Sequence, residues 1–201
     1  MRPTDRLISR PLVALAAALI LAGSAGSALA ATETLNFDGA HTRVGFSIRH
    51  FFTQVRGEFK NVTGTIALDQ ANLNASKVNV EIETASINTN NDRRDTHLRS
   101  GDFFDAEKNP KITFVSKTIA IKDNKGTMTG DLTMHGVTKP ITLHVKLLTS
   151  PNESKHTRWS VTTDPLKRRE FNLMFPQAAE SMSGISQTVA INIEIEAVRA
   201  E

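Results

Sequence analysis

The chain has 201 residues, with 24 Lys and Arg against 21 Asp and Glu, and no Cys. Because disulfides are excluded, packing of a hydrophobic core must supply the stability. Without its first 30 residues the chain keeps 21 basic and 20 acidic residues. That balance lacks the concentrated basic surface of nucleic-acid-binding proteins, so no nucleic-acid partner is expected.

Residues 1–30 have the pattern of a secretory signal peptide. Three Arg precede an apolar run, and Ala28–Ala30 offers an A-x-A cleavage site. The run is shorter than the roughly 20 residues of a membrane-spanning helix, which makes a retained anchor the weaker alternative. No Cys follows the cleavage site, which argues against a lipid anchor. We expect cleavage, export to the periplasm and one domain over residues 31–201.

Period-two alternation of apolar and polar residues dominates this domain and predicts β-strands. The alternating segments are residues 42–50, 55–59, 64–69, 77–83, 111–117, 127–134, 141–147, 158–163 and 188–197. Turn sequences at 123–126 and 135–140 join neighbouring segments at hairpin-loop length. One apolar and one polar face per strand favours an antiparallel sandwich or barrel. Glycines in and beside the strands favour the barrel, because they permit sharp coiling.

The segment RRDTHLRSGDFFD, residues 93–105, breaks the alternation. An Asn or Asp at 91–92 can cap a short helix there, and Gly101 can end it. Asp95 and Arg99 would then form an i,i+4 pair. The segment therefore predicts a short helical element that closes one end of the sheet structure.

The same segment has an enzymatic interpretation. Asp95, His97 and Asp102 contain a candidate acid–base pair, and Ser86 or Ser100 a candidate nucleophile. No G-x-S-x-G motif is present, and a helix turns Asp95 and His97 in different directions. We therefore favour a structural role and predict no catalytic residue.

Three other features have competing interpretations. The six His lack zinc-motif spacing, so no metal site is predicted, although ligands from distant strands stay an alternative. The basic run at 167–169 is interpreted as a solvated hairpin rather than an anion site. In each Phe pair, at 51–52 and 103–104, ordinary core packing competes with a ring that faces an apolar ligand.

Several motifs occur in order: FDGAHTRVGFSIRH, VRGEFKNVTGTIALD, R-D-x-H-L-R-S followed by F-F-D, G-x-L-T-x-x-G-V-T-K-P, and a closing INIEIEA. From about Leu35 to Ala197 this order resembles the YceI-like family of exported, lipocalin-like bacterial proteins. The resemblance implies an all-β, eight-stranded antiparallel lipocalin-like barrel with one short helical element. It also implies a non-catalytic protein, without cofactor, whose apolar interior holds a polyisoprenoid, an isoprenoid quinone or another long-chain lipid.

The resemblance extends to particular residues. The family's signature segment matches a set that is implied to fix the helical element against the barrel: Arg94, Asp95, His97, Leu98, Phe103, Phe104 and Asp105. Two departures bear on the ligand and the turns. Asn172 stands where the family often has Gly, and Asn tolerates a positive φ. The chain has no Tyr, which removes one common polar contact for a head group.

In a barrel the apolar phase of each strand faces inward. The predicted cavity-lining residues are therefore Phe46, Ile48, Val80, Ile82, Ile112, Phe114, Leu132, Leu143, Val145, Trp159, Ile191 and Ile193. Some of them are expected to fill the closed end as ordinary core. At the mouth we expect Arg49, His50, Phe51 and Phe52.

The expected function is binding of a long-chain amphiphile for transport, storage or stress protection. An exposed mouth also suggests transient membrane contact and a homodimer. Two alternatives stay open: an exported hydrolase that uses Asp95 and His97, and a lipid-free structural barrel plugged by its own side chains.

Overall fold

The computed structural model describes residues 32–150, 156–175, 180 and 182–200. The predicted signal peptide, residues 1–30, lies outside the described residues. No helix within the described part of the chain has the length and apolar character needed to cross a membrane.

The elements that lie wholly within the described residues are twelve strand segments and the α-helix α1 (Asp92–Arg99). Short 3-10 turns occupy Leu73–Ala75, Thr84–Ser86 and Arg168–Phe171. The strands are β1 (Glu33–Phe37), β2 (Arg43–His50), β3 (Thr53–Phe59), β4 (Val62–Leu68), β5 (Lys77–Glu83), β6 (Ile87–Asn88), β7 (Lys111–Lys122), β8 (Lys125–Met134), β9 (Val137–Thr149), β10 (His156–Thr163), β11 (Leu166–Lys167) and β12 (Thr188–Arg199).

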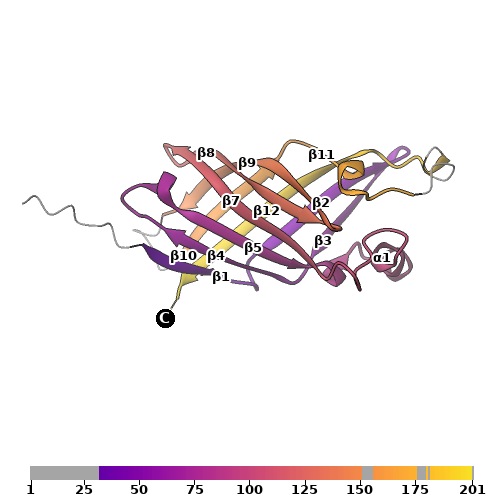
Figure 1. Ribbon diagram of the computed structural model, residues 1–201, viewed down its shortest axis with the longest axis horizontal. Helices are drawn as coiled ribbons and strands as arrows, with labels where there is room; N and C mark the ends of the chain where they lie inside the picture. Colours follow the sequence, from indigo (N-terminus) through magenta and orange to yellow (C-terminus); the bar gives the residue numbers. More distant parts are fainter. Residues whose placement is uncertain (1–31, 151–155, 176–179, 181, 201) are drawn as a thin grey trace, which may run out of the picture.

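Antiparallel pairing closes the sheet into an eight-stranded barrel, as predicted. Neighbours follow the order β1-β4-β5-β7-β8-β9-β10-β12, and β12 returns to pair with β1. The N-terminal half of β12 pairs instead with β2, which continues the sheet through β3 to β6. The barrel is therefore long, and Figure 1 shows β2, β3 and α1 at the end away from β1.

Close contacts of aromatic rings explain two of the predicted strand glycines. A Cβ on Gly57 would lie 2.4 Å from the Phe46 ring, and one on Gly64 would lie 2.6 Å from the Phe37 ring. Each ring occupies the space that a side chain at the glycine would need. These glycines thus let the interior faces curve around large inward side chains.

Two hairpins turn tightly through residues with positive φ. Asp123 and Asn124, at φ of 51° and 65°, join β7 to β8 in a turn shorter than the predicted 123–126, because β8 already begins at Lys125. His135 and Gly136, at 50° and 72°, join β8 to β9. The predicted loop over 135–140 is therefore too long, because β9 already begins at Val137. Pro140 lies inside that strand and is exposed.

The helix begins as predicted and ends differently. Asn91 caps α1 by accepting a hydrogen bond from the backbone N of Arg94 at 3.0 Å. The helix ends at Arg99, before Gly101, with Ser100 in an extended conformation. Arg99 donates to the carbonyls of Ala85 and Ile87 rather than to Asp95. The expected i,i+4 pair is thus replaced by bonds that tie the helix to the chain before it.

Candidate functional site

An apolar cavity runs inside the barrel as three adjoining compartments. Their volumes are about 290, 120 and 40 Å³, decreasing from the α1 end toward the opposite end. Phe59, Met134 and Ile191 border both the first and the second compartment. The second and third share another set of lining residues, which are Phe37, Val78, Met128, Val161 and Ile195.

Strand β12 gives the scale of this cavity. Its lining residues run from Val189 in the first compartment to Ile195 in the second and third. Six residues of extended strand span roughly 20 Å. The first compartment borders the surface, because its lining includes the exposed His97 and the partly exposed His50 and Phe175. We call this end the mouth.

A buried carboxylate holds α1 at the mouth. Asp95 is 3% exposed, and its Oδ1 accepts hydrogen bonds from the backbone N and the Oγ1 of Thr89, at 2.9 and 2.5 Å. Arg94 donates through Nε and Nη2 to the Oγ1 and the carbonyl of the same threonine. The two neighbouring charged residues therefore grip one residue of the preceding loop, as the structural interpretation requires.

Aromatic packing makes the signature segment one wall of the cavity. Leu98, Phe103 and Phe104 line the first compartment. The Phe104 ring meets Phe59 of β3 edge-on at 5.9 Å, and the Phe103 ring lies 5.5 Å from Phe175. These residues thus form cavity surface, which for Phe103 and Phe104 was one of the two interpretations left open.

The last residue of the signature set lies in the turn after α1. Asp105 has a φ of 46°, and its carboxylate pairs with Lys108 at 2.9 Å. Asn172, which follows the 3-10 turn Arg168–Phe171, also takes a left-handed conformation, with a φ of 57°. That turn therefore accommodates Asn where a Gly was expected.

The interpretation of residues 167–169 as a solvated hairpin is wrong for Arg168. This side chain is 2% exposed and lines the first compartment. It donates to the carboxylate of Glu180 and to the carbonyls of Leu173, Ile185 and Ser186. All of its donors are therefore engaged with the segment that covers this side of the mouth.

Glu180 stays ionised beside Arg168. Burial raises its pKa, but bonds from the Arg168 guanidinium, the backbone N of Phe175 and Arg169 outweigh burial, so the pKa lies below the ordinary 4.5. The pair is thus charged at neutral pH, and it fastens Glu180 to the residue that follows β11.

The mouth leaves a few polar groups free to meet a ligand. Among the described residues Nη1 of Arg94 has no partner, while its other donors are used by Thr89. In addition to Arg94 and Arg168, the titratable residues that line the first compartment are His50 and His97. These groups are hydrogen-bond donors or cations, in contrast to the apolar walls deeper inside.

The geometry does not assemble the hydrolase considered above. Asp95 is engaged with Thr89, and Nε2 of His97 lies 3.6 Å from the carboxylate of Asp102. The hydroxyl of Ser86 donates to the carbonyl of Glu83, and that of Ser100 to the carbonyl of His97. Within the described residues, neither hydroxyl bonds to the His97 ring.

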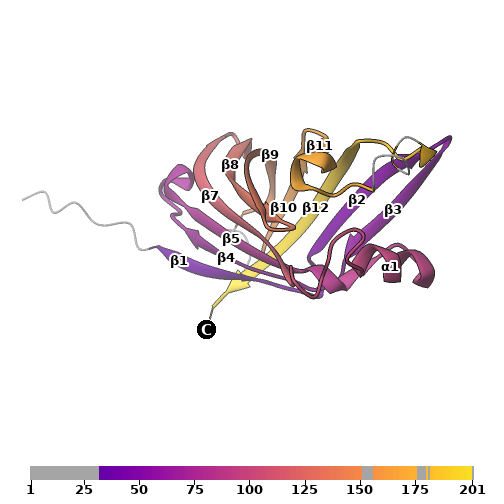
Figure 2. The same cartoon turned by 45° about the vertical axis from the view of Figure 1, so that its right-hand side comes forward.

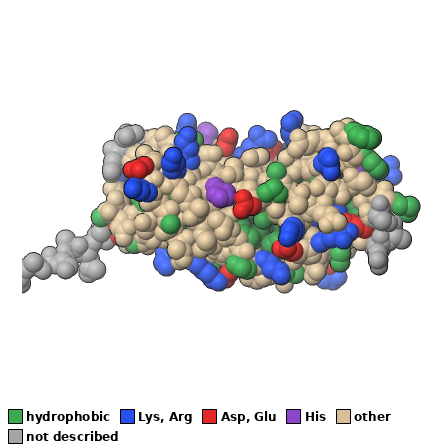
Figure 3. All heavy atoms as spheres, turned by 90° about the horizontal axis from the view of Figure 1, so that it is seen from above, with side chains coloured by type: hydrophobic (Ala, Val, Ile, Leu, Met, Phe, Trp, Pro, Cys, Tyr) green, Lys and Arg blue, Asp and Glu red, His purple; other side chains and the backbone are tan. Residues whose placement is uncertain are grey.

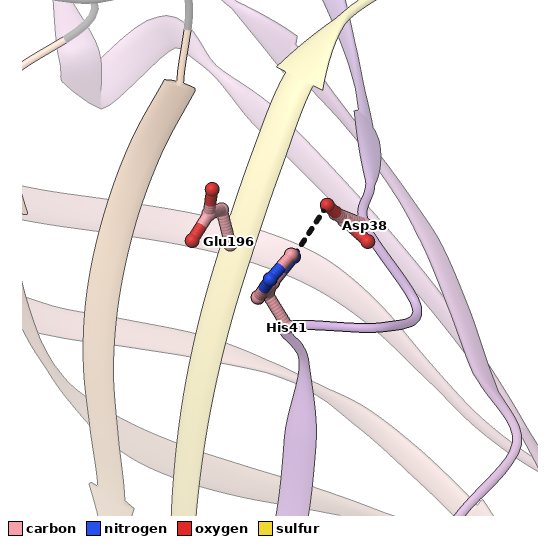
Figure 4. Close-up of side chains that lie close together, drawn as sticks. All are labelled: Asp38, His41 and Glu196. Carbon is pink, nitrogen blue, oxygen red and sulfur yellow. Dashed lines mark hydrogen bonds and ion pairs between the residues drawn. The ribbon is translucent and has the colours of Figure 1, made fainter.

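A second group of polar side chains lies at the turn between β1 and β2 and on the neighbouring part of β12 (Figure 4). Asp38, His41 and Glu196 bring ligand atoms within 4.8 Å of one another, the distance range of a metal site. Asp38 pairs with Nδ1 of His41 at 2.7 Å, and Arg158 holds Glu196 at 2.8 Å. A metal would compete with a proton and a guanidinium there. The group is accounted for as an ion-pair network between the β1–β2 turn, β10 and β12.

The cavity brings together all but two of the predicted ligand-binding residues. The first compartment contains Phe46, Ile48, His50 and Ile191. The second contains Val80, Ile82, Ile112, Phe114, Leu132, Leu143, Ile191 and Ile193. The third contains Val145 and Trp159. Phe51 and Phe52 line none of the three, because they lie exposed at the tip of the β2–β3 hairpin.

Other cavity-lining residues were not predicted. Val55, Phe59 and Val189 lie on the apolar phase of predicted strands, so the alternation alone can find them. Others lie in short strands or irregular segments that no period reveals: Ile87, Thr89, Leu173, Phe175 and Ile185.

Comparison with known proteins places the chain in a family. The model of the YceI-like domain matches residues 35–197. The chain belongs to the YceI-like domain family. Protein YceI of Escherichia coli O6:H1 is 38% identical over 180 residues, which are 88% of this chain and 91% of that protein.

Solved structures of the YceI-like family have the same barrel. The Campylobacter jejuni YceI crystal structure is 37% identical, with a TM-score of 0.66, and the match covers 82% of this chain and 96% of that one. A polyisoprenoid-binding domain from Saccharophagus degradans is 18% identical, with a TM-score of 0.60, covering 84% and 99%. The latter likeness establishes the shared fold alone.

Proposed function

We propose that this YceI-like protein binds a long-chain amphiphile, of the polyisoprenoid class, inside its barrel. The observation that carries the proposal is the apolar cavity that extends from the mouth through three compartments. A polyisoprenoid is long, narrow and apolar, so it matches a cavity of this shape. The Saccharophagus degradans domain, named as polyisoprenoid-binding, supports the choice of this ligand class.

The energy of such binding comes from the walls. Burial of each CH₂ contributes about 0.8 kcal/mol, so a five-carbon isoprene unit contributes roughly 4 kcal/mol before the costs of association. A few units then give tight binding without a charged anchor. Phe114 and Leu132 face the second compartment, and as hydrocarbon side chains they contact a ligand through apolar surface only.

We assign the orientation of the ligand from the polar groups. The tail occupies the second and third compartments, and the head group stays at the mouth beside Arg94, His97 and His50. These groups favour a head group that accepts hydrogen bonds or carries negative charge, such as a phosphate or a quinone carbonyl. The protein would act as a carrier or store of this lipid.

Export follows as part of the proposal. The N-terminal pattern over residues 1–30 directs the chain to the periplasm, where a lipid with a long isoprenoid tail needs a protein to cross the aqueous space. N-terminal sequencing of the protein recovered from the periplasm should begin at Ala31. Recovery of the uncleaved chain from the membrane would contradict this part of the proposal.

The test is native mass spectrometry of the exported protein, purified without detergent. We expect an added mass that extraction and fragmentation identify as an isoprenoid lipid. An apo mass, together with no uptake of added polyisoprenol or isoprenoid quinone, would overturn the proposal. The plugged, lipid-free barrel would then be the better description.

A further inference from the structure

Exposed hydrophobic side chains gather at the mouth. The large ones within the described residues are Phe51, Phe52, Met174, Met182, Val115 and Leu148, and only the last two lie elsewhere. Phe52 is fully exposed, and Met182 is 75% exposed. Figure 3 shows hydrophobic side chains at the end opposite the grey N-terminal trace, the end that carries the hairpin tip in Figure 1. We call Phe51, Phe52, Met174 and Met182 the apolar rim.

The rim is tied to the cavity opening by direct contacts. The backbone N of Phe51 donates to the carbonyl of Gly184 at 2.8 Å. The Phe51 ring also lies over Gly184, where an added Cβ would come within 2.4 Å of it. Ile185, next to that glycine, lines the first compartment, as do the residues on both sides of Met174. The two halves of the rim therefore border the same opening.

The tip of the β2–β3 hairpin carries a residue that its backbone conformation does not favour. Phe51 holds a φ of 49°, a left-handed conformation that glycine or asparagine adopts far more easily. A hairpin tip that served only to reverse the chain would favour those residues. Instead the turn projects two phenyl rings, one of them fully into solvent.

Positive charge flanks the rim on the outer face of the same hairpin. Arg49 and Arg56 are exposed, and neither forms an ion pair within the described residues. Arg43, farther from the tip, is in contrast neutralised by Glu58 at 2.7 Å. The uncompensated charge is thus confined to the part of the hairpin nearest the aromatic tip. Apolar tips beside free cations are the signature of binding to an anionic lipid surface.

We propose that the mouth end of the barrel docks onto an anionic lipid bilayer. Phe52 and Met182 enter the boundary between head groups and acyl chains, and Arg49 and Arg56 contact lipid phosphates. The mouth then faces the membrane, so a lipid can pass between bilayer and cavity without crossing water. The inference rests on the proposed function for its purpose, and its evidence is the apolar rim together with Arg49 and Arg56.

A second copy of the chain fits this surface less well. A twofold dimer brings the same patch of both copies together. The free arginines of the two hairpins would then approach each other without acidic partners. A bilayer with anionic head groups supplies the missing negative charge, and its surface yields to narrow projecting tips.

The experiment uses residues 31–201, because every strand of the barrel lies within this range. The protein is floated with vesicles of phosphatidylcholine alone, or of phosphatidylcholine mixed with phosphatidylglycerol, both free of isoprenoid. We expect flotation with the anionic vesicles, weakened by added salt. No flotation with either vesicle at low salt would overturn the inference.

Paired variants test the apolar rim and the two arginines separately. We expect Phe52→Ser with Met182→Ser to reduce vesicle affinity by at least about tenfold, because both side chains lose apolar burial. The matched control is Val115→Ser with Leu148→Ser, exposed hydrophobics away from the mouth, and it should bind as the parent does. An equal loss in the control pair would overturn the role of the rim.

A second pair of variants, with its own matched control, tests Arg49 and Arg56. We expect Arg49→Gln with Arg56→Gln to reduce affinity for the anionic vesicles by roughly tenfold or more, with little effect on neutral ones. The control pair is Lys122→Gln with Lys125→Gln, at the distant β7–β8 turn. A loss of the same size in this control would show a net-charge effect and overturn the assignment.

Two readouts keep this inference separate from the proposed function. Uptake of an isoprenoid quinone from dilute ethanol, without vesicles, should be unchanged in Phe52→Ser with Met182→Ser. A wild-type protein that floats but takes up no lipid would leave docking standing and remove the proposed function. Light scattering that shows a dimer, abolished by the same two substitutions, would instead assign the rim to a second copy and overturn docking.

Discussion

Asp95 illustrates how one side chain fixes the role of the signature segment. An acid that served as a general base would keep a lone pair open toward the cavity. Asp95 instead directs its Oδ1 to the N–H and the hydroxyl of Thr89, out of solvent. It also lies in the first turn of α1, where the helix dipole favours a negative charge.

We therefore expect Asp95→Asn to lower the free energy of unfolding by about 1–3 kcal/mol, because a buried charge-assisted acceptor is weakened. Thermal and urea unfolding followed by circular dichroism measure it. Asp102→Asn, at an exposed position on the same segment, should change stability by less than about 0.5 kcal/mol. Unchanged stability together with loss of a hydrolytic activity would favour the enzymatic interpretation. His97→Ala should have little effect on stability, because that side chain is half exposed.

The ion pair between Asp38 and His41 predicts that the stability of the protein depends on pH. The hydrogen bond to Asp38 and the nearby Glu196 raise the pKa of His41 above its ordinary 6.5, and His41 in turn lowers the pKa of Asp38 below 3.8. Because the histidine pKa is raised on folding, its contribution is full below about pH 6.5 and fades as pH rises through the raised value. His41→Gln should therefore cost more stability near pH 5.5 than near pH 9. Urea unfolding at both pH values measures the difference, and an equal cost would contradict the pairing.

At the scale of elements, polar contacts place segments that hydrophobic pattern leaves undetermined. Strand β11 has only two residues, yet the buried Arg168 that follows it binds the backbone at three places and Glu180 besides. This one side chain replaces the ladder of hydrogen bonds that a longer strand would make. Leu173, Glu180, Ile185 and Ser186 are therefore tied to one another through this single side chain.

We expect Glu180→Gln to destabilise the protein by roughly 3–5 kcal/mol, since it leaves Arg168 buried without its counter-ion. Because folding lowers the pKa of Glu180, the stability that the wild-type ion pair contributes is present above about pH 4.5. It is lost as the pH falls through the lowered pKa. The variant should thus lose its disadvantage in acid. Denaturant unfolding from neutral to acidic pH checks this, with Glu170→Gln, exposed beside Lys167, as the control.

On the scale of the whole molecule, the barrel is a container whose capacity is set by its two ends. Inward side chains fill the β1 end, where Leu35 and Trp159 are buried, and leave space toward α1. Figure 2 shows the strands splaying toward α1 and the β2–β3 hairpin. The taper of the cavity, from about 290 to about 40 Å³, makes the α1 end the entrance.

Ile191 borders both larger compartments, so a bulky side chain there should divide the cavity. We expect Ile191→Trp to reduce binding of a long polyisoprenol by at least about tenfold while the thermal stability changes little, because the added ring enters existing space. Titration with isoprenoids of graded length measures the effect, and short ones should bind nearly as well as before. Ala190→Trp, facing outward on the same strand, is the control. Equal affinity for all lengths would contradict passage of the tail beyond this residue.

The sequence by itself determined the class of the fold, the place of the two hairpin turns, the start of the helix at 91–92 and most of the cavity wall. It could do so because strand alternation is local: the phase of Ile191 or Phe114 follows from its immediate neighbours. The closed ring, the burial of Arg168 and the solvent-facing tip at Phe51–Phe52 were decided only by the tertiary structure. Each depends on what lies opposite in space, as Glu180 lies opposite Arg168 and Gly184 opposite Phe51, and no local period encodes such a partner.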